Sequence, residues 1–263
     1  MFFGMPNLVE CRDIYECIDT ASKHKLNFVE INTSFPNYRP DTLNVDKLSA
    51  LAKERGIFYT IHADEELNPF DFNPKVSKCY FDVMRDTVEF AKALNIPVIN
   101  MHLRKGVYVT LPDRVVLLTD VYRDEYMARV REFVHMVEEA VGNSGVKIAI
   151  ENVDTNIFTK SQIEAFDIFF ASGVFGLTLD VGHDACMAGK DRHIFEKYPE
   201  RLIHMHLHDS DGKHAHLPLG EGTVDVKKTL SILKSDSTCL VEVKTLAGLD
   251  SSVAYLRREK IMN

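Results

Sequence analysis

The chain has 263 residues, of which 45% are hydrophobic and 27% charged, and these proportions are ordinary for a soluble globular protein. Its net charge of -8 argues against a generally basic nucleic-acid-binding protein, although it leaves room for a local basic groove. The five cysteines are odd in number and scattered without a CxxC pair, which is typical of reduced thiols in the cytosol rather than of a disulfide framework.

The beginning of the chain carries no targeting pattern. Met1 to Glu10 has no basic region followed by a long apolar run, so no signal peptide is expected. No stretch reaches the roughly 18 apolar residues that a membrane span requires, so no membrane partner is expected either. These features predict a cytoplasmic protein.

Short apolar runs alternate with longer helical patterns along the whole chain. Most of these runs lack polar alternation, as expected for parallel strands that are covered on both faces. The predicted strands are Phe2–Gly4, Asn27–Ile31, Ile57–His62, Pro97–His102, Val146–Glu151, Phe175–Asp180, Leu202–Leu207 and Cys239–Val243.

The segments between these runs carry helix signals. Apolar residues recur at helical spacing most clearly in Val76–Leu94 and in Arg123–Val141, which we predict as amphipathic helices. Thr159 is a candidate N-cap for a further helix. The stretch Leu103–Tyr122, after the fourth strand, is expected to be the longest irregular insertion and to lie over the catalytic end of a barrel.

Eight strand-then-helix units leave two α/β architectures, a closed barrel and a doubly wound open sheet. No GxGxxG or GxxxxGK[ST] follows any strand, so the nucleotide-binding open sheet lacks its usual signature. A length of roughly 250 residues is typical of one (β/α)₈ barrel. We therefore predict that residues 1–263 form a single (β/α)₈ TIM barrel domain.

Six successive predicted strands finish on a histidine or a carboxylate. In a parallel barrel these ends converge on one face, where the active sites of this architecture lie. Carboxylates gathered there would repel one another, and a divalent cation such as Mn²⁺, Zn²⁺, Fe²⁺ or Co²⁺ would relieve that repulsion. The residues are His62, His102, Glu151, Asp180, His206 and Glu242, with His183 directly after the sixth strand.

The seventh strand offers three histidines on one face, His204, His206 and His208, because side chains alternate along a strand. Only one of them can lie at the depth of the metal, and we predict that it is His206. His204 is expected inside the barrel and His208 at the rim or beside the ligands. Asp209 is expected to orient a ligand imidazole from outside the ligand set.

These strand ends resemble those of the xylose isomerase-like barrel superfamily. The superfamily includes sugar isomerases and epimerases, inosose-processing enzymes, and the endonuclease IV type of abasic-site nuclease (AP endonuclease family 2). The resemblance spans nearly the whole chain. It is carried by Ile150-Glu151-Asn152, Leu179-Asp180-Val181-Gly182-His183, the run from His206 to Gly212, the run from His216 to Gly222, and Val241-Glu242.

In the isomerase and epimerase branch, the resemblance implies one metal held by Glu151, Asp180, His206 and Glu242. The two glutamates would also serve as acid and base through an enediolate, and His183 would hydrogen-bond the substrate. The expected activity is a metal-dependent isomerase or epimerase of a small sugar or cyclitol. Mn²⁺ or Zn²⁺ is the expected cofactor, with Co²⁺, Fe²⁺ and Mg²⁺ as alternatives, and a homo-oligomer is compatible with this activity.

The endonuclease IV branch is the alternative, with three zinc ions and DNA as the partner. The resemblance then assigns further ligands to His62, His102, His183 and His216, although His214 replaces the aspartate of the Asp-x-His pair. Against this alternative, no Gly-rich stretch follows Glu151, and the loop after His62 is acidic, whereas a duplex-binding rim needs Lys and Arg. The number of ions is therefore between one and three. A non-catalytic metal- or sugar-binding barrel is the third hypothesis.

Overall fold

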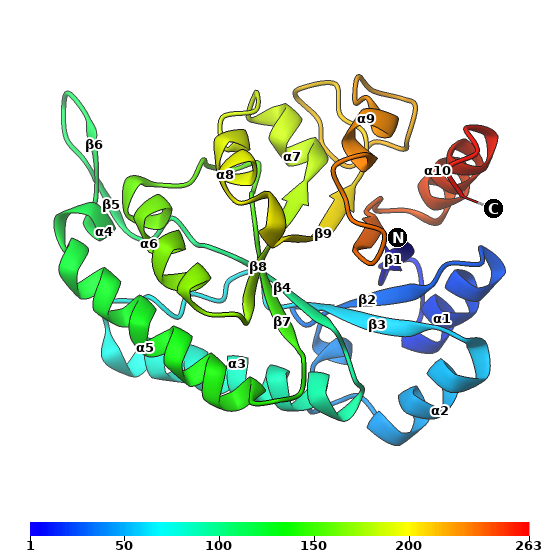
Figure 1. Ribbon diagram of the computed structural model, residues 1–263, viewed down its shortest axis with the longest axis horizontal. Coiled ribbons are helices and arrows are strands. Elements are labelled where there is room, and N and C mark those ends of the chain that lie inside the picture. Colours follow the sequence, from blue (N-terminus) through cyan, green and yellow to red (C-terminus); the bar gives the residue numbers. More distant parts are fainter. Residues whose placement is uncertain (263) are drawn as a thin grey trace.

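The computed structural model describes residues 1–262, and in it eight parallel strands close into a barrel (Figure 1). Around the barrel the order of the strands is β1, β10, β9, β8, β7, β4, β3 and β2. This is the predicted (β/α)₈ fold. The strands are β1 (Phe2–Pro6), β2 (Phe28–Asn32), β3 (Phe58–His62), β4 (Val98–His102), β7 (Lys147–Glu151), β8 (Phe175–Asp180), β9 (Leu202–Leu207) and β10 (Thr238–Val241).

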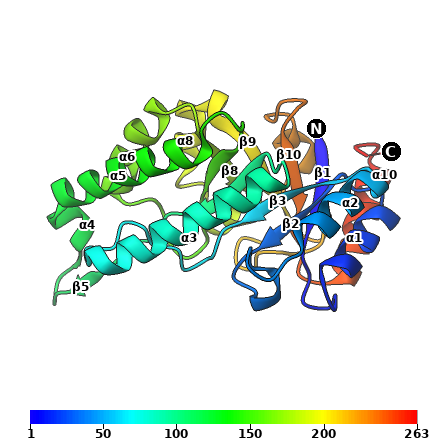
Figure 2. The ribbon, with the colours of Figure 1, turned by 90° about the horizontal axis from the view of Figure 1, so that it is seen from below.

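Helices cover the outside of the barrel, and α3 and α5 lie side by side along it (Figure 2). The helix α5 has the predicted bounds, whereas α3 begins two residues early because the side chain of Asn73 caps it and Pro74 fits its first position. The helices are α1 (Ile14–Lys23), α2 (Val45–Arg55), α3 (Pro74–Ala93), α4 (Leu118–Val121), α5 (Arg123–Val141), α6 (Lys160–Ala171), α7 (Val181–Cys186), α8 (Arg192–Lys197), α9 (Val226–Leu230) and α10 (Leu246–Arg258), with short 3₁₀ helices η1 (Pro36–Tyr38) and η2 (Pro199–Arg201).

Thr159 caps α6 as the sequence predicts. Its hydroxyl accepts the backbone N–H of Gln162 at 3.2 Å, and the Gln162 side chain accepts the backbone N–H of Thr159 at 2.8 Å. The two residues thus form a capping box, which satisfies two backbone donors that would otherwise lack partners at the start of the helix.

The prediction of an irregular insertion after β4 is wrong in part, because the segment contains regular secondary structure. It forms an antiparallel hairpin of β5 (Tyr108–Thr110) and β6 (Val115–Leu117), which leads into α4. Val and Tyr have strong β propensity, and the intervening Pro and Asp are typical turn residues. The hairpin projects from one edge of the molecule in Figure 1, away from the barrel strands.

The strand register sets the depth of the side chains at the carboxyl end of the barrel. His102 of β4 pairs with Glu151 of β7, and Asp180 of β8 pairs with His206 of β9. The two residues of each pair are therefore neighbours on adjacent strands, and on its other side Glu151 pairs with Thr178 of β8. Within residues 1–262, none of the helices combines the length with the apolar content that crossing a bilayer requires.

Candidate metal centre

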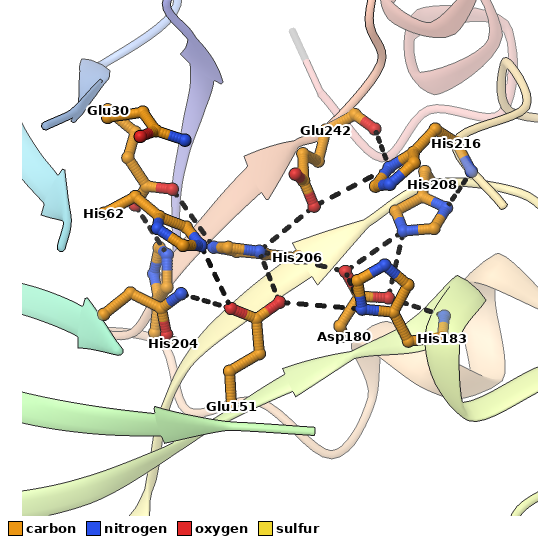
Figure 3. Close-up of polar contacts among 12 residues, drawn as sticks. Glu30, His62, Glu151, Asp180, His183, His204, His206, His208, His216 and Glu242 are labelled. Atoms are coloured by element: carbon orange, nitrogen blue, oxygen red, sulfur yellow. Dashed lines mark hydrogen bonds and ion pairs between the residues drawn. The ribbon is translucent and has the colours of Figure 1, made fainter. Parts of the chain in front are cut away.

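Four acidic or imidazole side chains meet at the carboxyl end of β7 to β10 (Figure 3). Glu151 and Asp180 are the last residues of their strands, His206 lies in β9, and Glu242 directly follows β10. Each residue offers a ligand atom, and these atoms all lie within 4.8 Å of one another. All four residues are buried. The structure thus brings together the four predicted ligands.

His206 lies at the middle of this group. Its Nδ1 is 3.0 Å from Oε1 of Glu151, 3.1 Å from Oε2 of Glu242 and 3.8 Å from Oδ2 of Asp180. Despite these distances, both ring nitrogens of His206 and Oε2 of Glu242 are buried without an aligned hydrogen bond among the described residues. Buried polar atoms without partners are costly. Donor atoms that face a common point rather than one another are the arrangement that ligands of a divalent metal adopt, so these residues fit such a metal.

The side chain of Glu151 is held through its other oxygen. Its Oε2 lies 3.0 Å from Nε2 of His102 and 3.4 Å from Nε2 of His62, and it also accepts the side-chain amide of Asn100. Oε1 consequently faces His206. The contribution of Asn100 was not foreseen from the sequence, although an amide near the end of a buried strand is a signal of a buried hydrogen bond.

Glu242 is held in the same way by a different partner. Its Oε1 accepts from Nζ of Lys244 at 2.7 Å, which leaves Oε2 facing His206. Lys244 was also missed in the sequence, because it lies beyond the end of the strand. Each glutamate therefore has one oxygen held by neighbours and one directed at the centre.

The charges of the centre compensate one another. Burial by itself raises the pKa of Glu151 and of Glu242, but the positive charge of His206 outweighs it and holds both pKa values well below the ordinary range. Burial lowers the pKa of His206, whereas Glu151, Glu242 and Glu30 raise it, and the resulting pKa is well above that of an ordinary histidine. In the metal-free protein a proton on His206 therefore supplies the positive charge.

Asp180 is fixed by the start of α7 and by His208. It accepts the backbone N–H of His183 at 2.7 Å, and His208 Nε2 lies 2.9 Å from its Oδ1. The backbone N–H of His216 donates to His208 Nδ1 at 2.7 Å, so the neutral ring carries its proton on Nε2 and donates it to Asp180. His208 thus lies beside a predicted ligand.

Gly182 makes room for the His208 ring, because a Cβ at this position would overlap it. We expect Gly182→Ala to destabilise the protein by about 1–3 kcal/mol, since the buried ring is held at both nitrogens and cannot shift freely. Thermal unfolding measures this effect, as a decrease in Tm. Gly173→Ala is the matched control, because nothing lies within 4 Å of a Cβ there. Equal Tm values for both variants would contradict this prediction.

The predicted additional ligands gather on the two sides of the centre. His62 and His102 form a group with Glu151, and His183 and His216 form another with His208. In each group the ligand atoms lie within 4.8 Å of one another, so each group has the spacing of a metal site. His214 does not join them, because its exposed ring bonds to Asp211 instead.

Asp209 is placed differently from the prediction. Its carboxylate accepts backbone N–H groups of Ser210, Gly220 and Val224 at 2.9 to 3.0 Å, and within residues 1–262 it contacts no imidazole. The side chain therefore shapes the loop after β9 rather than orienting a ligand.

His204 lies inside the barrel, as predicted, and contacts a residue that the sequence did not single out. Its Nε2 is 3.1 Å from Oε2 of Glu30, a fully buried glutamate on β2. A lone charge within the apolar strand run Phe28–Asn32 is the signal that could have found Glu30, because a buried charge requires partners.

Comparisons with known proteins show the family of the chain. The family described as xylose isomerase-like TIM barrel matches residues 18–259. Two relatives come from Methanocaldococcus jannaschii. Uncharacterized protein MJ1311 is 26% identical, covering 98% of this chain and 88% of its own, and MJ1614 is 25% identical, covering 79% of each.

Solved structures share the fold at low sequence identity. A D-tagatose 3-epimerase-like protein aligns over 100% of both chains with a TM-score of 0.77 and 24% identity. A 3-keto-D-glucoside 4-epimerase from E. coli aligns over 100% of both chains with a TM-score of 0.76 and 15% identity. The IolI protein, with a bound zinc atom, aligns over 99% of this chain and 97% of its own, with a TM-score of 0.74 and 16% identity.

Proposed function

Because the chain belongs to the xylose isomerase-like TIM barrel family, we propose that it is a metal-dependent isomerase or epimerase of a small sugar or cyclitol. Glu151, Asp180, His206 and Glu242 hold the metal in this proposal, and Zn²⁺ or Mn²⁺ is the expected ion. The epimerases among the similar structures and the zinc atom in the IolI structure support this substrate class and cofactor.

The observation that carries the proposal is the position of the two glutamates. Glu151 ends β7 and Glu242 directly follows β10, so β8 and β9 separate them around the barrel, and both contact Nδ1 of His206, Glu242 from above and Glu151 from below in Figure 3. A bound divalent metal would supply Lewis acidity that makes a C–H next to a carbonyl acidic. One glutamate, as a carboxylate, would remove that proton, and the other, protonated beforehand from solvent, would donate its proton to the opposite face and invert the carbon. Exchange of both groups with solvent would then restore the starting protonation states. Return to the neighbouring carbon would isomerise the sugar instead.

The surroundings of the glutamates suit proton transfer. Both carboxylates are buried and ionised in the metal-free protein, so either can act as the base, whereas the one that acts as the acid must first take up a proton. His183, whose Nδ1 is 3.4 Å from Asp180, is buried beside the centre and is the residue that we assign to a substrate oxygen.

An abasic-site endonuclease remains the second candidate, and the two flanking histidine groups favour it because they offer further metal sites. The loops around the centre do not favour an endonuclease. Glu66 pairs with Arg104 at 3.0 Å, and Asp64 and Glu65 lie in the same loop. The carboxylates of this loop would repel the phosphates of a duplex, and Arg104 is already paired.

Metal content and proton exchange together test the proposed function. We expect one equivalent of metal by elemental analysis and incorporation of deuterium from D₂O into at least one member of a panel of ketoses and inososes. Three zinc ions, cleavage of abasic-site DNA and no exchange would show that the endonuclease is correct instead.

A further inference from the structure

A second layer of polar side chains lies beneath the metal centre, inside the barrel. Glu30 of β2, Thr60 of β3, His204 of β9 and Thr238 of β10 are all buried. A carboxylate at this depth requires partners for its charge, so the contacts of Glu30 indicate its role.

One oxygen of Glu30 is occupied by neutral donors. Its Oε2 accepts the Thr60 hydroxyl at 2.7 Å and lies 3.1 Å from Nε2 of His204. A carboxylate cannot donate, so the His204 proton is on Nε2, and the Thr238 hydroxyl, 2.6 Å from Nδ1, donates to that nitrogen.

The other oxygen of Glu30 lies near His206, with 3.1 Å between Oε1 and Nε2, a distance for an ion pair although the hydrogen bond is not aligned. On the opposite edge of the same ring, Nδ1 faces Glu151 and Glu242. Figure 3 shows these three glutamates on different sides of His206. An imidazole binds a metal through a nitrogen that has no proton, and the partner of the second nitrogen decides which one that is.

We propose that Glu30 is a positioning residue for the metal centre. It holds the proton of His206 on Nε2 and thereby presents the Nδ1 lone pair to the point that Glu151, Asp180 and Glu242 share. This inference rests on the metal site of the proposed function, but not on its substrate or its reaction.

A metal between Glu30, His204 and His206 is the competing explanation, because their ligand atoms also lie within 4.8 Å of one another. The hydrogen bonds argue against it. Oε2 of Glu30 already accepts from Thr60, and both nitrogens of His204 are engaged by Thr238 and Glu30. A metal there would displace these contacts, whereas a metal at Nδ1 of His206 displaces none of them.

The experiment uses full-length protein with Zn²⁺. The affinity for Zn²⁺, measured by competition with a chromophoric chelator, is expected to fall about 10- to 100-fold in Glu30→Gln, because the outer partner of a ligating histidine contributes that much. Glu89→Gln, an exposed glutamate on α3, is the control and should bind as the wild type does. An unchanged affinity in Glu30→Gln would overturn the inference.

A second measurement does not depend on the variant folding. In ¹⁵N-histidine-labelled wild-type protein loaded with Zn²⁺, His206 should show a protonated Nε2 that exchanges slowly with solvent and an unprotonated Nδ1. A proton on Nδ1 would overturn the role of Glu30. Wild-type protein that takes up no Zn²⁺ would overturn the metal centre itself, whereas Zn²⁺ binding without sugar turnover would overturn only the proposed reaction.

Discussion

Glu242→Gln and Glu151→Gln are each expected to lower kcat by about 10²- to 10⁴-fold on the substrate that the wild type converts, as the loss of a general acid or base does. Glutamine keeps the shape of the side chain and can still contact His206, but it cannot accept a proton from carbon. In the proposed mechanism each glutamate serves one face of the substrate, so the loss of either one should stop inversion. Steady-state assays of conversion measure this loss.

Deuterium exchange distinguishes the roles of the two glutamates better than an assay of substrate conversion does. A variant that lacks one base should no longer exchange the proton of the epimer that this base serves, yet it should still exchange the proton of the other epimer without inverting it. Glu221→Gln, an exposed glutamate in the loop after β9, is the control and should behave as the wild type. If both active-site variants lose only substrate affinity and keep turnover, the acid–base assignment is wrong.

The sequence predicted the barrel and the four-residue centre because both depend on signals local to each strand. An apolar run that ends on Glu, Asp or His identifies a strand and the side chain at its carboxyl end at once. Glu151 and Asp180 are each the last residue of a strand in the structure, and neither required knowledge of its neighbours.

The residues that support the centre were not predicted from the sequence, because their roles depend on contacts between strands. Glu30 meets His206 only because the stagger of β2 against β9 across the closed barrel brings them to one depth, and no local pattern encodes that stagger. Lys244 lies outside its strand and turns back to Glu242. Asp209 was misassigned for a related reason, because its partners are backbone groups of a loop whose path the sequence does not specify.

Metal affinity is expected to rise about tenfold for each pH unit between pH 6 and pH 8, because a metal ligand must be deprotonated. The pKa of His206 in the metal-free protein is raised well above its unfolded value. Below that folded pKa, a metal must displace one proton from Nδ1, so affinity increases with pH and levels off only above the folded pKa. Calorimetric titration with Zn²⁺ in buffers of different ionisation enthalpy measures both the affinity and the number of protons released.

The same raised pKa predicts the opposite trend for the stability of the metal-free protein. The proton on His206 contributes stability that is fully present below the unfolded pKa of about 6.5 and is lost as pH rises through the folded pKa. Removing the metal with a chelator should therefore lower Tm more at pH 9 than at pH 6. His135→Gln, at an exposed position on α5, should leave both trends unchanged. A metal affinity that does not vary with pH would contradict the proposed ligand role of His206.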